Sequence, residues 1–232
     1  TWSRTITDRP DDFVLDVDRP AFDRGLAPNH RAHVFNASLI FPLPALEGGS
    51  GLVRHVLGDW AVGALVFAAS GSPITVLAGE VPGFNQGPSG TGVGVTQRPN
   101  RVAGQPCRAS GGSREQWLNP EAFTLSGFEL GTLGDAGRGT CEGPGFFQVD
   151  LALYKDVRLG GKIKLQLRFE AFNVLNRTQF SVIDNTMDPT AVTLDAPIET
   201  ATRIAAFQPS RSFGQATAAR DPRQLQLGVK VT

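Results

Sequence analysis

The fold is decided by residues 162–172, which read Lys162-Ile163-Lys164-Leu165-Gln166-Leu167-Arg168-Phe169-Glu170-Ala171-Phe172. Polar residues alternate with apolar ones, and a period of two predicts a β-strand whose faces meet different surroundings. One face carries Lys162, Lys164, Gln166, Arg168 and Glu170. The other carries Ile163, Leu165, Leu167, Phe169 and Ala171. Because the run matches the roughly 9–11 tilted residues of a membrane-crossing strand, we expect the polar row to face a lumen and the apolar row to face lipid.

The same alternation recurs along the chain. Residues 148–157 and 224–231 alternate in the same way, and residues 31–41 place Phe35, Leu39 and Phe41 on one face. Arg158-Leu159-Gly160-Gly161 predicts a tight hairpin between two of these strands. Residues 60–76 predict either one long strand with a kink at Ser70–Pro73 or two shorter strands. Residues 1–7 are interpreted as the remnant of a further strand.

The predicted fold is therefore all-β and antiparallel, with about six consecutive strands. Short links near residues 42–59 and 157–162 alternate with long ones near residues 8–29, 79–147 and 176–222. Outer-membrane barrels show this asymmetry, with short periplasmic turns and long extracellular loops. About six strands are too few to close a barrel, so alone they would form an open, curved sheet.

Composition excludes several classes of protein. Among 232 residues, 22 basic and 22 acidic side chains give a formal net charge of +0, and no basic block indicates nucleic-acid binding. Charged residues make up 19%, below the roughly 25% of an average protein. No apolar run is long enough for a transmembrane helix, and no signal-peptide pattern opens the chain.

The two cysteines, Cys107 and Cys141, lie in a stretch rich in Gly, Pro and Ser. Their spacing fits no metal site, so we interpret them as a candidate disulfide that staples a long loop in an oxidising compartment. The alternative is two unpaired thiols. His30 and His33 lack an identifiable third ligand, which favours a place at the rim over a metal centre.

No catalytic, cofactor-binding or metal-binding residue is predicted, and we expect no enzyme. The run Gly90–Gly94 lacks the strand and helix context of a phosphate loop, and Ser70-Gly71-Ser72 does not meet the pattern of a nucleophile elbow. The charged row of residues 162–170 is interpreted as a hydrated wall rather than a substrate strip. Asn173 and Asn176 are interpreted as caps at the strand exit, with ligand binding as the alternative.

Several motifs occur in an order that resembles one family. Residues 169–180, Phe-Glu-Ala-Phe-Asn-Val-Leu-Asn-Arg-Thr-Gln-Phe, resemble the penultimate strand of Oar-like TonB-dependent outer-membrane receptors. Further matches keep the family's order along the chain: the opening residues 1–8, Gly58-Asp59-Trp60, Ser70–Pro73, Arg98-Pro99-Asn100, Asn119–Phe123, Gly143-Pro144-Gly145 leading to Asp150–Lys155, and Pro222–Gly228. The chain departs from the family at its end, Val231-Thr232, where an aromatic residue is usual.

The resemblance implies the C-terminal strands of a large barrel in the bacterial outer membrane, with residues 1–232 as one partial barrel domain. It also implies that the receptor's plug domain, its TonB box and the small carboxypeptidase-regulatory-like domain of this branch lie outside this sequence. The implied partners are outer-membrane lipid, the remainder of the barrel and plug, and TonB, with no cofactor. The implied function is import of a nutrient whose identity the loops do not reveal. The alternatives are a surface or adhesion protein of the outer membrane and a soluble β-sandwich that binds carbohydrate.

Overall fold

A computed structural model describes residues 1–8, 20–44, 51–79, 97–159, 163–197 and 200–231. Within them, strands dominate, and the helices are α1 (Gly51–Leu57) and the short 3-10 turns η1 (Pro20–Asp23) and η3 (Pro120–Ala122). In this part of the chain, no helix has the length and apolar character needed to cross a membrane.

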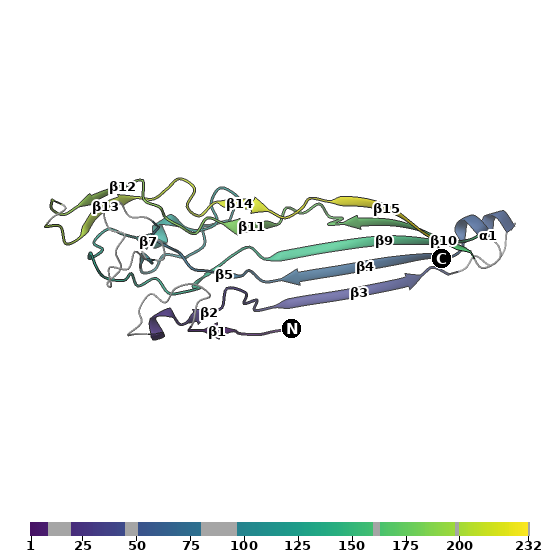
Figure 1. The fold of residues 1–232 in the computed structure, drawn as a ribbon, viewed down its shortest axis with the longest axis horizontal. Helices are drawn as coiled ribbons and strands as arrows, with labels where there is room; N and C mark the ends of the chain where they lie inside the picture. Colours follow the sequence, from purple (N-terminus) through teal and green to yellow (C-terminus); the bar gives the residue numbers. More distant parts are fainter. Residues whose placement is uncertain (9–19, 45–50, 80–96, 160–162, 198–199, 232) are drawn as a thin grey trace.

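Five long strands form one antiparallel sheet (Figure 1). They are β3 (Val34–Pro42), β4 (Trp60–Ala69), β9 (Phe146–Arg158), β10 (Lys164–Phe172) and β15 (Gln224–Val231). Their spatial order is β15-β10-β9-β4-β3, so each strand pairs with the next long strand along the chain. The sheet is open, which confirms the predicted all-β, antiparallel class and the unclosed sheet.

The connections differ at the two ends of this sheet. α1 joins β3 to β4, and a short link, with Leu159 N donating to Ile163 O, joins β9 to β10 at the same end. The long links from β4 to β9 and from β10 to β15 leave from the opposite end, as Figure 1 shows. The predicted alternation of short and long links is therefore present.

The long links are folded. We call the described residues of 70–145 and 173–223 the excursion module. Its strands form four two-stranded antiparallel ladders. The ladders are β5 (Pro73–Ile74) with β8 (Cys141–Glu142), β6 (Asn100–Arg101) with β7 (Phe123–Thr124), β11 (Phe180–Ile183) with β14 (Ala216–Ala219), and β12 (Ala191–Leu194) with β13 (Ile204–Gln208).

The hydrophobic core lies in this excursion module and not on the five-stranded sheet. One cluster surrounds Leu118, Phe123 and Met187, and a second surrounds Leu125 and Ile204. No residue of the five long strands belongs to the buried members of either cluster among the described residues. Apolar burial thus stabilises the module, whereas the apolar residues of the sheet are exposed on β3 and β15 and mostly half-buried on the central strands.

The predicted stretch 60–76 consists of two strands. β4 ends at Ala69, and β5 begins at Pro73 in a separate ladder. A Cβ at Gly71 would overlap the carbonyl oxygen of Gly143, so only glycine permits this close approach of two backbones. Gly71 thus lies in the break between β4 and β5.

The N-terminal segment differs in one respect from the prediction. It makes a bridge between Trp2 and His33, but its strand β1 (Ile6–Thr7) pairs with β2 (Gly25–Leu26) rather than extending the five-stranded sheet. The sheet therefore holds five of the about six expected strands.

Candidate functional site

The polar row of β10 lies on one face of the sheet together with polar residues of its neighbours. Register places Gln166 between Asp156 and Lys230, and directly paired residues point to the same side. The amide Nε2 of Gln166 donates to Asp156 Oδ1 at 2.9 Å, and Arg168 Nε donates to Gln166 Oε1 at 2.8 Å. Lys162, the first residue of the predicted row, lies outside the described residues. We call this side the polar face.

The polar face changes character from β10 toward β3. Arg168 places its guanidinium carbon 5.8 Å from the ring centroid of Tyr154, and this ring in turn lies against Gly63 of β4. Beyond Gly63 the same face carries Ile40 and Leu65, both more than half exposed. The hydrogen-bonded network thus joins β9 to β10, and β15 adds Gln226 and Lys230 to the same face. The face is apolar over β4, whereas β3 carries both Ile40 and the polar residues Asn36 and Ser38.

The opposite side, which we call the apolar face, carries the second predicted row. Leu167 pairs with Val229, Phe169 with Leu227, and all of them point away from the polar network. Leu225 and Leu227 are 78% and 77% exposed. Ile163 precedes β10 and is also exposed. The apolar face further includes side chains of β9, β4 and β3: Leu151, Leu153, Val62, Ala64, Val66, Phe35, Ala37, Leu39 and Phe41.

One cation, Lys155, lies on the apolar face at the end next to α1. It pairs with Leu167 and Trp60 in the ladder but is only 5% exposed, because its ammonium turns toward the backbone. Its Nζ donates to the carbonyl oxygens of Gly58 and Asp156 and lies 5.8 Å from the centroid of the Trp60 ring. Such a side chain keeps its stem in apolar surroundings while its charge reaches polar groups. The alternating pattern of the sequence did not predict Lys155 as a cation on the apolar face.

The two asparagines after β10 turn the chain. Asn173 and Asn176 both have φ of 48°, in the left-handed region that asparagine tolerates better than most residues. Asn173 is buried, its Oδ1 accepts from Arg177 N, and its own N–H donates to Asp150 Oδ1 at 2.8 Å. All these partners are internal, and the geometry is that of a structural cap.

The Arg98-Pro99-Asn100 motif anchors the module to the segment near η1. Arg98 is 2% exposed, and its Nη2 donates to Phe22 O at 2.9 Å. The same guanidinium lies 3.7 Å from Asp23 Oδ1 and stacks 4.1 Å from the Phe22 ring centroid. Burial lowers the pKa of Arg98, and the Asp23 carboxylate opposes that shift. A buried arginine with these partners has a structural role.

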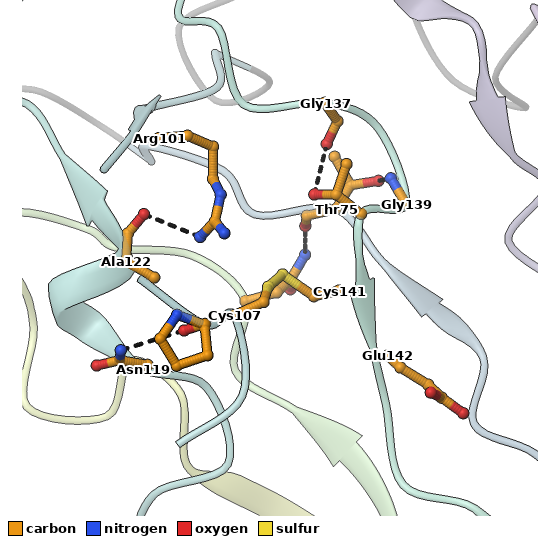
Figure 2. The surroundings of a disulfide bond; sticks show 12 residues. Thr75, Arg101, Cys107, Asn119, Ala122, Gly137, Gly139, Cys141 and Glu142 are labelled. Atoms are coloured by element: carbon orange, nitrogen blue, oxygen red, sulfur yellow. Dashed lines mark hydrogen bonds between the residues drawn. A yellow bond between two sulfur atoms is a disulfide. The ribbon is translucent and has the colours of Figure 1, made fainter. Parts of the chain in front are cut away.

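A disulfide joins Cys107 to Cys141 within the core of the excursion module (Figure 2). Their Cα atoms are 5.6 Å apart, in the usual range for this bond. Asn119 N donates to Cys107 O, and β8 pairs Cys141 with Ile74. The bond therefore ties the segment before η3 to a strand ladder that borders the five-stranded sheet.

The described residues hold no cluster of three or more potential metal ligands. His30 is buried, and its Nδ1 accepts a hydrogen bond from Thr5 N at 3.2 Å. His33 begins the pairing between β3 and the residues after β4, where its N–H donates to Ser70 Oγ. The Gly90–Gly94 run lies outside the described residues.

A family model described as an outer membrane beta barrel domain matches residues 1–226. The matched region contains the excursion module and every strand of the sheet except the last residues of β15. No curated protein and no solved structure matches the chain.

Proposed function

Since the chain belongs to the outer membrane beta barrel domain family and lies in the bacterial outer membrane, we propose that it forms barrel wall of a TonB-dependent receptor that imports a scarce nutrient. The assignment to the TonB-dependent receptors rests on the Oar-like motifs and on the two faces of the sheet. The observation that carries it is the exposed apolar face backed by a hydrogen-bonded polar face.

The two faces suit lipid on one side and water on the other. In a bilayer, exposed Leu225 and Leu227 would be solvated by acyl chains, whereas in water they would form an aggregation-prone surface. The polar network from Asp156 through Gln166 to Arg168 would line a hydrated lumen or pack against a plug. Trp60 and Lys155 would lie at the membrane interface, where aromatic rings and cations with apolar stems are enriched.

The edge strands and the direction of the long links indicate how the wall would lie in the parent barrel. β3 and β15 are the edges of the sheet, and further strands of the parent barrel would pair with them. Because all the long links leave one end, the excursion module would stand outside the cell, and α1 would lie on the periplasmic side. The plug and the TonB box would belong to the parent protein.

A second candidate function is attachment or recognition at the cell surface, without transport. The folded core of the excursion module favours it, because a module with its own core can present a binding surface by itself. The soluble β-sandwich is disfavoured, since the apolar face is not covered by a second sheet among the described residues and the family places the chain in the outer membrane.

Cysteine labelling tests the orientation of the wall. Leu227→Cys and Gln226→Cys place a single thiol on opposite faces of β15, and the native disulfide remains protected without reductant. In outer-membrane vesicles, a membrane-impermeant maleimide should label Cys at 226 and spare Cys at 227. Equal labelling of both positions would contradict a lipid-facing apolar side.

Uptake measurements separate the two candidate functions. A strain without this gene and a strain without TonB should share a growth defect on the same limiting nutrient, and a plasmid copy should restore growth only when TonB is present. If the deletion strain grows like its parent on every limiting nutrient but loses surface attachment, the second function replaces the first.

A further inference from the structure

A hollow on the polar face, at the end next to the excursion module, has a lining unlike the rest of the wall. Its volume is about 410 Å³. It is lined by Arg31, Val34, Phe67, Ala69, Phe146, Gln148 and Arg220. Register puts Val34, Phe67, Ala69, Phe146 and Gln148 on the same side of β3, β4 and β9. The two arginines come from segments far apart in the chain, just before β3 and just before β15.

The two guanidinium groups face this hollow as like charges. Arg31 is held in place because its Nη1 donates to Ser70 O at 2.6 Å. Arg220 places its guanidinium carbon 4.7 Å from the centroid of the Phe146 ring. Partial burial lowers the pKa of Arg31, and the nearby charge of Arg220 lowers it further. Within the described part of the chain, neither arginine forms an ion pair with a carboxylate.

Apart from Gln148, the remainder of the lining is apolar. Phe67 and Phe146 meet edge to face with centroids 5.2 Å apart, and Val34 and Ala69 flank them. Asp150, farther along β9, accepts hydrogen bonds from Gln148 Nε2 and Asn173 N and does not line the hollow. The hollow therefore combines two guanidinium groups with an aromatic wall.

We propose that this hollow binds a small organic anion, with its carboxylate or phosphate between Arg31 and Arg220 and its apolar part against Phe67 and Phe146. Guanidinium groups donate in a fork that matches the oxygens of both anions, and an anion there would relieve the repulsion of the two cations. An apolar concavity with a few convergent polar groups is the usual form of a small-molecule site. Binding in the hollow depends only on this geometry and does not require transport.

Calorimetric titration of the intact parent protein in detergent with phenyl phosphate and with benzoate tests the site. Arg220→Gln and Arg31→Gln should each weaken binding about tenfold or more, since each removes a charged hydrogen-bond donor. Arg31→Lys, which keeps the charge, should retain more affinity than Arg31→Gln. Arg158→Gln is the matched control, because it removes the same charge from the same face at the opposite end of the sheet. It should leave the affinity unchanged.

Comparison of probes reports on the aromatic lining. Inorganic phosphate should bind more weakly than phenyl phosphate, and stronger binding of phenyl phosphate than of benzoate would identify phosphate as the preferred group.

Equal loss of affinity in Arg158→Gln and Arg220→Gln would overturn the proposal, because it would show diffuse charge attraction. A structure of the intact protein with a carboxylate of another segment between Arg31 and Arg220 would also overturn it. Neither result depends on whether a nutrient is imported.

Discussion

Tyr154 of β9 lies over Gly63 of β4, and a Cβ at position 63 would be 3.2 Å from the Cε2 atom of the tyrosine ring. The same added Cβ would be 3.4 Å from the Cβ of Ala152. Glycine at 63 thus makes room for an aromatic side chain on the polar face, and Arg168 contacts the same ring. The contact links three adjacent strands, β4, β9 and β10.

Replacing Gly63 by valine should displace the Tyr154 ring. We expect the free energy of unfolding to fall by about 1–3 kcal/mol, the usual cost of overpacking. Urea unfolding of the protein in detergent, followed by Trp fluorescence, measures the change. Gly228→Val is the control, because a Cβ there would meet only the flexible Arg168 side chain at 3.7 Å. Equal effects at both positions would contradict the role given to Tyr154.

A charge on the apolar face should prevent stable insertion, whereas the same charge on the polar face should not. Leu227→Arg should destabilise the folded protein in lipid by about 2–4 kcal/mol if position 227 lies near the bilayer midplane. Gln226→Arg is adjacent and should change stability by less than about 1 kcal/mol. Heat-modifiable mobility after refolding into vesicles measures the folded fraction. If both variants fold equally well, the apolar face does not contact lipid.

Removing the disulfide should loosen the excursion module and leave the sheet intact. The bond closes a loop between residues separated by 34 positions, and the chain-entropy relation gives a loss of about 3–4 kcal/mol. The double variant Cys107→Ala, Cys141→Ala should show faster hydrogen exchange at β7 and β8 than the oxidised protein. Exchange in β10 should stay unchanged. Loss of protection in both regions would mean that module and sheet unfold together.

The hairpin of β12 and β13 should respond to acid through Asp195. The Thr202 hydroxyl, followed by the backbone N–H groups of Arg203 and Thr202, holds the pKa of this carboxyl below its ordinary value. Its contribution to stability is therefore complete above the unfolded pKa of about 3.9 and is lost as pH falls through the lower folded pKa. The Thr202 amide resonance should shift in that acid range. Asp195→Asn should abolish this pH-dependent shift, and its persistence would assign the titration to another group.

The five-stranded sheet could be predicted because its signal is local. β9, β10 and β15 alternate with a period of two and β3 does so over part of its length, whereas β4 is apolar throughout. The alternation assigns each residue of Lys164–Phe172 to a face without any knowledge of the partner strands. The pairing of the strands could also be predicted, because each long strand pairs with the next long strand along the chain. For the same reason the alternation of short and long links could be predicted from the sequence.

The core of the excursion module could not be predicted in the same way. Apart from the β12–β13 hairpin, its ladders involve strands of two to four residues whose partners are distant in sequence, such as Ile74 with Cys141. Two paired residues show no periodicity, so nothing local distinguishes them from loop. The hollow between Arg31 and Arg220 depends on the same long-range folding, because the two side chains meet only after the segment before β15 has returned to the sheet.

The folded core and the disulfide order the excursion module before any partner binds to it. A loop that must become ordered when it meets its target loses conformational entropy and binds more weakly for the same contact area. Here the excursion module is already ordered by the burial of side chains such as Leu118 and Phe123 and by the disulfide at Cys141. Anything that binds this end of the protein therefore meets a preorganised shape, and its affinity is set by complementarity to that shape.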